Sequence, residues 1–149
     1  MADKTPAIEV RPAGPDRWAD VEQVLGPKGA YGGCWCMFFR LSGREFEHGA
    51  GEANRKSLRA LVCDRTPAPG LVAYLDGVPV GWCAVAPRAD YPRVLRSPIN
   101  RPAPDDDQAD ASVWAVTCFY VRRGHRRTGV AASLLAAAVD FAIEHGARI

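Results

Sequence analysis

The residues with the clearest chemical purpose form a basic turn between an apolar stretch and a long helical pattern. Four arginines crowd into this turn, and Gly129 follows just before the helical periodicity begins. The first turn of a helix has unpaired backbone N–H groups and the positive end of the helix dipole, so it binds phosphate oxygens well. Gly129 has no side chain to obstruct a phosphate, and the arginines supply neutralising charge. The turn therefore predicts a phosphate site near Thr128 and Gly129. The four arginines are Arg122, Arg123, Arg126 and Arg127.

The surrounding sequence excludes other uses of such a turn. No Gly-Lys-Ser/Thr follows, so the turn is not a Walker-type loop, and the first Gly-x-Gly of a dinucleotide fingerprint is missing. The net charge is only +2, and the basic cluster is short and lacks interleaved aromatic residues. We therefore expect no nucleic-acid partner.

A strand and a helix must hold the turn in place. Val113 to Val121 is the clearest strand pattern in the chain, and a long helix follows the turn. Gly146 is well placed to stop this helix. The residues expected on its inward face are Val130, Leu134, Ala138, Phe141 and Ala142.

The rest of the chain predicts a small mixed domain. Ile8 to Arg11 alternates like a short strand, and Asp16 can cap a helix that ends at Gly26-Pro27. A second helix is expected from Glu52 to Cys63. Leu71 to Leu75 and Val80 to Val85 form a hairpin across Asp76-Gly77. The segment from Pro87 to Pro104 is rich in proline and is expected to be a long loop.

The stretch Arg126-Arg127-Thr128-Gly129-Val130-Ala131 resembles motif A of the GNAT N-acetyltransferase superfamily, (Arg/Gln)-x-x-Gly-x-(Gly/Ala). The motif begins five residues after Val121, and the Leu134-Leu135 pair also fits the family pattern. The resemblance implies an α/β (α+β) fold, with a central, mixed and mostly antiparallel sheet flanked by helices. A single domain over residues 1–149 is expected. Another strand would be expected near 147–149, and absence of the family's last C-terminal strands stays open.

The resemblance also implies the ligand and the reaction. Acetyl-CoA would be the acyl donor, with its pyrophosphate held by backbone amides from Arg127 to Ala131. Backbone groups of Phe119 and Val121 would pair with the pantetheine arm. An amine of a small molecule or a peptide would attack the thioester directly; a non-catalytic acyl-CoA-binding module is the alternative. The cofactor-binding residues are expected to be Phe119, Tyr120, Val121, Arg126, Arg127, Thr128, Gly129, Val130 and Ala131.

The groups that would move protons are not assigned by the sequence. In histone-type relatives a Glu stands six residues before the position of Val121, and this chain has Ala115 there. Asp110, just before the strand, is the best of several weak carboxylate candidates for catalysis. A cap or a solvated charge is the other interpretation of Asp110, and the favoured one.

Aromatic residues between the first two helices could form the wall of an acceptor pocket. Trp35 and Phe38 lie there, and Tyr91 in the proline-rich segment could also face a substrate; simple core packing is the alternative. The connection from Tyr31 to Arg40 also contains Cys34-Trp35-Cys36. A lone Cys-x-Cys lacks the second pair of a zinc site, so we expect buried thiols beside a packed Trp and no metal.

Composition sets the expected setting of the protein. The five cysteines show no repeated spacing, and no apolar run is long enough to span a bilayer. The N-terminal sequence lacks the pattern of a signal peptide. We therefore expect a cytoplasmic protein without a membrane partner. Its expected partners are acetyl-CoA and an amine acceptor, and a homodimer stays open.

Overall fold

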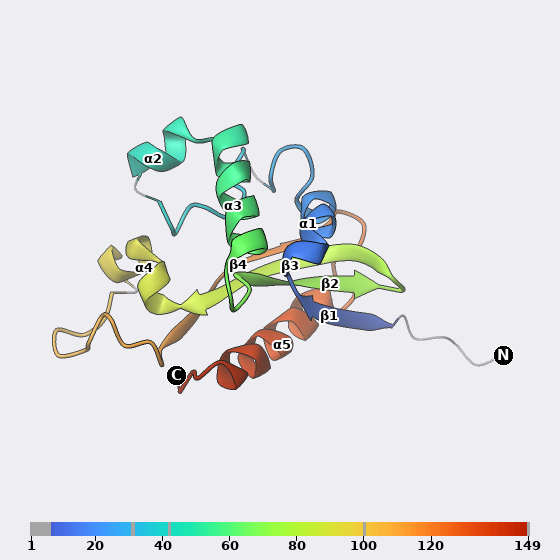
Figure 1. Ribbon diagram of the computed structural model, residues 1–149. Helices are drawn as coiled ribbons and strands as arrows, with labels where there is room; N and C mark the ends of the chain where they lie inside the picture. Colours follow the sequence, from blue (N-terminus) through green and yellow to red (C-terminus); the bar gives the residue numbers. More distant parts are fainter. Residues whose placement is uncertain (1–6, 31, 42, 100, 149) are drawn as a thin grey trace.

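The computed structural model describes residues 7–30, 32–41, 43–99 and 101–148, and arranges them as one sheet with helices on both faces (Figure 1). The strands lie in the order β1-β2-β3-β4, and every neighbouring pair is antiparallel. This confirms the expected antiparallel sheet flanked by helices. Tyr31, Ile149 and the first four residues, on which parts of the predictions rest, lie outside the described residues. The strands are β1 (Ile8–Pro12), β2 (Gly70–Leu75), β3 (Val78–Pro87) and β4 (Trp114–Val121).

The central strands are apolar throughout because both faces of the sheet are covered. On β3, Trp82 and Ala84 pack on the side of the N-terminal helices, whereas Cys83 and Val85 pack on the side of the C-terminal helix. Successive side chains of a strand point to opposite faces, so two cores require apolar residues at every position. The sequence of β3 is therefore a continuous apolar run rather than an alternating one.

The C-terminal helix α5 (Val130–Glu144) covers one face of the sheet (Figure 1). All five residues predicted for its inward face are buried, which confirms the predicted period. Gly146 has φ of +100° and its N–H donates to Ile143 O at 3.1 Å, so this glycine ends the helix as predicted. Ala147 and Arg148 form no strand; the Arg148 N–H instead donates to Ser112 O at 2.7 Å.

The opposite face carries α1 (Trp18–Leu25), α2 (Gly43–His48) and α3 (Glu52–Asp64) (Figure 1). The expected capping role of Asp16 is wrong. Asp16 lies inside a 3-10 turn, Pro15–Arg17, and α1 has no side-chain cap. The 3-10 turn begins at Pro15 and runs up to the first residue of α1. Arg17, and not Asp16, therefore occupies the N-cap position of α1. α2 was not predicted, because its six residues are too short to show a period and none is buried.

The segment from Pro87 to Pro104 is not one long loop. It contains a 3-10 turn, Arg88–Asp90, and the short helix α4 (Pro92–Arg96). Tyr91 and Val94 are buried here against Ala86, and Pro92 occupies the first turn of α4, where its missing N–H costs nothing. The prolines therefore start an element at this place as well as breaking the chain. None of the helices in the described residues has the length and apolar character needed to cross a membrane.

Candidate functional site

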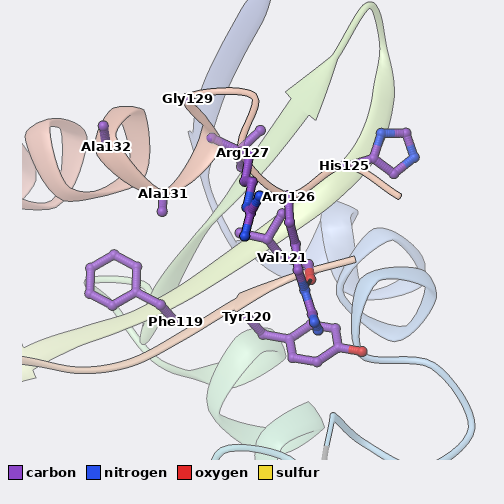
Figure 2. Close-up of a pocket in the computed structure, with 10 residues that line it drawn as sticks. Phe119, Tyr120, Val121, His125, Arg126, Arg127, Gly129, Ala131 and Ala132 are labelled. Atoms are coloured by element: carbon purple, nitrogen blue, oxygen red, sulfur yellow. Dashed lines mark hydrogen bonds between the residues drawn. The ribbon is translucent and has the colours of Figure 1, made fainter. Parts of the chain in front are cut away.

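A cavity of about 290 Å³ lies where the end of β4 meets the first turn of α5. Figure 2 shows the labelled side chains that line it, which come from β4, from the basic turn and from α5. Every residue predicted to bind the cofactor lines this cavity except Thr128, whose hydroxyl donates to His125 O and so closes the turn. His125 and Ala132 also line it, although neither was selected from the sequence. Their place beside the motif is the only signal that could have indicated them.

The first turn of α5 presents free backbone donors to this cavity. Gly129 is the N-cap residue and provides no side-chain cap, and the Ser133 N–H makes the first bond within the helix, to Gly129 O at 3.0 Å. The N–H groups of Val130, Ala131 and Ala132 therefore have no partner within the helix. Their donors and the helix dipole attract an anion at this point.

Two residues directly before α5 have left-handed backbone conformations. Arg127 has φ of +62° and Gly129 has φ of +87°. Left-handed residues in a turn bring successive N–H groups to one concave side, which is the geometry of an anion-binding nest. A Cβ on Gly129 would meet only Ile8 Cδ1, at 3.9 Å. The backbone conformation therefore favours a glycine at position 129, whereas packing does not, because the space beside this residue is open.

A second glycine sets the position of the helix on the sheet. A Cβ on Gly81 of β3 would lie 2.7 Å from Val130 Cγ1 and 3.1 Å from Leu134 Cδ1. Both side chains are fully buried. The first two turns of α5 therefore approach β3 more closely than any larger residue at position 81 would allow. Gly81 places the helix end beside the strand edge, and no sequence pattern indicated this role.

The edge of β4 beyond the sheet is open within the described residues, because there β4 pairs with β3 alone. The Arg122 N–H donates to Val80 O at 2.8 Å. Residues that bond to the neighbour alternate with those that do not, so Tyr120 also faces β3, and Phe119 and Val121 direct their backbone groups to the open edge. Arg126 Nε donates to Val121 O at 3.1 Å, as expected for a carbonyl that points away from the sheet.

The cavity is electropositive. Arg126 and Arg127 are exposed, and among the described residues no carboxylate forms an ion pair with either of them. Figure 2 shows both side chains between the start of the helix and β4, whereas the His125 ring points away from the other labelled residues. Two guanidinium groups that no described carboxylate neutralises, beside unpaired amides, suit a ligand with several phosphate charges.

The Asp110 carboxylate is held by neighbouring side chains and backbone in the turn before β4. Its carboxylate accepts hydrogen bonds from the Ser112 N–H at 2.9 Å and from the Ser112 hydroxyl at 2.7 Å, and it pairs with Arg148 at 3.3 Å. The two bonds from Ser112 hold the pKa of Asp110 below its ordinary value. A carboxylate so stabilised is a weak base, so this geometry favours the interpretation of Asp110 as a turn residue over a catalytic role.

Ala115 of β4 packs against a small buried cluster that contains Tyr91. Tyr91 packs against Ala115 and Ala86 and is only 1% exposed. Burial raises the pKa of Tyr91 to about 12, although the nearby Arg40 guanidinium opposes this rise. Arg40 lies over the Tyr91 ring at 4.9 Å, and neither the Tyr91 hydroxyl nor Arg40 Nη2 has a hydrogen-bond partner within the described part of the chain. Arg40 was not selected from the sequence, and no motif indicates it.

The three residues predicted for the acceptor side differ in exposure. Trp35, like Tyr91, is buried, and its ring lies 6.2 Å from that of Trp18. Phe38 is 41% exposed, with Phe46 edge-on at 5.5 Å and the Arg93 guanidinium 4.1 Å from its ring centre. Phe38 alone of the three offers a large surface to a ligand without rearrangement.

The two cysteines that were expected to be buried differ in exposure. Cys36 is buried, Cys34 is partly buried, and both are free. No group of three or more His, Cys, Asp or Glu side chains within the described ranges is placed to hold a metal ion.

Taken together, an uncapped helix N-terminus, two exposed arginines and an open strand edge would suit an elongated, phosphate-bearing ligand. A sequence profile described as the Acetyltransferase (GNAT) family matches residues 35–149. The chain belongs to this GNAT acetyltransferase family. No curated protein sequence matches it.

Solved structures share its fold at low sequence identity. An aminoglycoside N-acetyltransferase AAC(6')-Iy, solved with CoA, has a TM-score of 0.61 at 16% identity, covering 99% of this chain and 77% of that one. A ribosomal-protein-alanine N-acetyltransferase from Brucella melitensis biovar Abortus 2308 has a TM-score of 0.56 at 17% identity, covering 95% and 76%. The PaiA N-acetyltransferase from Thermoplasma acidophilum, solved with coenzyme A, has a TM-score of 0.54 at 14% identity, covering 94% and 74%.

Proposed function

We propose that this protein is an acetyl-CoA-dependent N-acetyltransferase that transfers the acetyl group to a primary amine of a small molecule or peptide. The observation that carries this proposal is the cavity between the uncapped first turn of α5 and the open edge of β4. Family membership supports it, and so do the coenzyme A molecules in two of the similar structures.

The residues around the cavity fit acetyl-CoA in two places. The pyrophosphate would lie against the backbone amides from Arg127 to Ala131, because these donors are free and Gly129 leaves the approach open. The pantetheine arm would run along β4, where the backbone groups of Phe119 and Val121 face outward. The bond from Arg126 to the Val121 carbonyl must then be exchanged for one from the ligand, which frees the guanidinium for a phosphate.

The reaction in this proposal is a direct transfer. The amine nitrogen forms a bond to the thioester carbonyl carbon, the carbon–sulfur bond breaks, and coenzyme A leaves as its thiolate while the amine loses a proton. Attack requires the neutral amine, so a base or a water chain must accept that proton. Phe38 is the most accessible of the predicted acceptor-side residues, whereas Trp35 and Tyr91 are buried in the core.

The alternative is a module that binds acyl-CoA without catalysis. Two observations favour it: Ala115 stands where histone-type relatives carry a Glu, and Asp110 is held by Ser112 and Arg148. Neither observation concerns the cavity itself, which would serve both functions.

Calorimetry with acetyl-CoA, followed by thiol-release assays over a panel of amines, tests the proposal. Binding with release of coenzyme A that depends on an amine supports the transferase. Binding without turnover on any amine supports the binding module, and no binding contradicts both. An RNA or DNA partner would instead give binding that weakens steeply with salt and does not compete with coenzyme A.

A further inference from the structure

A second, apolar pocket lies at the start of β4, at the other end of this strand from the proposed phosphate site. Its volume is about 210 Å³, and its walls come from β4 and from the second half of α5. Among the described residues, no carboxylate or lysine side chain lines it. The pocket therefore suits an apolar group. Its main apolar lining residues are Trp114, Val116, Ala138, Val139, Ala142 and Ile143.

The polar side-chain atoms in this wall already have partners. Trp114 Nε1 donates to Ala111 O at 3.1 Å. The guanidinium of Arg148, which also lines the pocket, pairs with Asp110 at 3.3 Å. A ligand is therefore not needed to satisfy either group, and the charge of Arg148 is already balanced. Burial of a charged ligand group here would cost free energy without a free counterion, so the wall favours a hydrocarbon chain.

The apolar pocket follows the cavity at the start of α5 along the same strand and helix. α5 runs back along β4, so its last turns lie beside the start of that strand (Figure 1). Ala131 lines the cavity at the start of α5, whereas Val139 and Ile143 line the apolar pocket. Residues four apart share one face of a helix, and Leu135 lies between them, 48% exposed. An apolar stripe on α5 therefore connects the two sites.

The length of the pantetheine arm matches this arrangement. Between the diphosphate and the thioester carbonyl, pantetheine has roughly as many chain atoms as four to five residues, or about 13–16 Å when extended. A strand advances about 3.3 Å per residue, so an arm that starts beside Val121 and follows β4 brings the carbonyl to Thr117 or Val116. Val116 belongs to the wall of the apolar pocket. The acyl group of the donor therefore enters this pocket.

We propose that the apolar pocket binds the acyl chain of the donor, and that the protein prefers unbranched saturated acyl-CoA longer than acetyl-CoA. This inference rests on the proposed transferase function and adds the class of acyl group. A cavity of about 150 Å³ holds benzene, so the volume here suits a chain of about four to eight carbon atoms. In the transfer, the amine nitrogen bonds to the acyl carbonyl carbon and the carbon–sulfur bond breaks. Coenzyme A leaves as its thiolate, and the amine gives its proton to a base or to water.

Calorimetry of the full chain with acetyl-, butyryl-, hexanoyl- and octanoyl-CoA tests the proposal. Each methylene that enters the pocket should raise the affinity about fourfold, so hexanoyl-CoA should bind on the order of a hundredfold more tightly than acetyl-CoA. An affinity that stays constant or falls with chain length would overturn this proposal and leave acetyl-CoA binding intact. Absence of binding by all four would contradict the proposed function as well. Tighter binding of succinyl-CoA than of butyryl-CoA would overturn the assignment to a hydrocarbon chain.

A variant that fills the pocket gives a second, independent reading. Val139 is exposed on α5 at the pocket wall, so Val139→Trp adds bulk there without entering the core. This variant should remove most of the affinity difference between hexanoyl-CoA and acetyl-CoA. Ala136→Trp is the matched control, because Ala136 is exposed on the same helix and lines neither site, and it should keep the difference.

Sedimentation of the wild type and of Val139→Trp distinguishes an acyl chain from a second copy of the protein as the occupant. We expect no change in mass between the two proteins. A wild-type dimer that Val139→Trp dissociates, together with an affinity independent of acyl length, would show that a second copy covers this pocket and would overturn the proposal.

Discussion

Replacement of Gly129 by glutamate is the sharpest perturbation that the structure offers. Position 129 is left-handed, and a Cβ there would have only Ile8 Cδ1 near it, at 3.9 Å. A side chain at this position meets no packed neighbour and instead occupies the approach to the amides of α5. The introduced carboxylate would also place a negative charge where we propose that the pyrophosphate binds.

The magnitudes separate folding from binding. A residue with a Cβ in the left-handed region costs roughly 1–2 kcal/mol, whereas the free energy of unfolding of a domain is about 5–15 kcal/mol. Hydrogen bonds to charged groups contribute about 1.5–3 kcal/mol each, so the loss of two amide–phosphate bonds removes about 3–6 kcal/mol of binding free energy. This corresponds to a loss of affinity on the order of 10² to 10⁴. The variant should fold and bind acetyl-CoA barely or not at all.

Calorimetry with acetyl-CoA and thermal melting, applied to Gly129→Glu and to a matched control, measure the two effects. Gly124→Glu is the control, because Gly124 has φ of +92°, has no atom within 4 Å of a Cβ, belongs to the same turn and does not line the cavity. Both variants should melt a few degrees below the wild type, and only Gly129→Glu should lose binding. Unchanged affinity in a folded Gly129→Glu protein would refute the proposed phosphate site.

Three further outcomes follow from other parts of the structure. Gly81→Ala should destabilise the fold by about 1–3 kcal/mol in denaturant melts, because its Cβ would overlap Val130. It should also weaken acetyl-CoA binding, because the start of α5 would move. No change in either stability or binding would contradict the close approach of α5 to β3. Asp110→Asn should lower Tm slightly at pH 7, because the depressed pKa of Asp110 contributes stability above the ordinary value of 3.8 that is lost as the pH falls through the folded pKa. The difference should vanish in acid, and acetyl transfer should persist; a collapse of kcat would instead indicate a catalytic carboxylate. Phe38→Ala should raise KM for the amine and leave acetyl-CoA affinity unchanged, and the reverse pattern would place Phe38 outside the acceptor side.

Long elements with a clear period could be predicted from the sequence. The inward face of α5 follows from residues such as Leu134 and Phe141, which recur at helical spacing and are buried as expected. The hairpin follows from Asp76-Gly77, where both residues adopt the positive φ that the turn requires. In each case the local sequence pattern and the tertiary packing favour the same conformation.

Short elements and tertiary contacts could not be predicted in this way. α4 has only five residues, which are too few to show a helical period in the sequence. It is stabilised by the burial of Tyr91 and Val94. The role of Gly81 depends on a helix that begins almost fifty residues later. Spacing could indicate the phosphate site because strand, turn and helix are contiguous; the acceptor side is assembled from separate segments.

The most direct test of the central claim is a calorimetric comparison of acetyl-CoA with acetyl-pantetheine, which keeps the thioester arm and lacks the pyrophosphate. We predict one-to-one binding of acetyl-CoA and an affinity for acetyl-pantetheine at least about a hundredfold lower, since the amide and arginine contacts at the start of α5 are lost. Equal affinity for the two ligands, or no binding of acetyl-CoA, would contradict the claim that the Thr128-Gly129 turn holds the pyrophosphate.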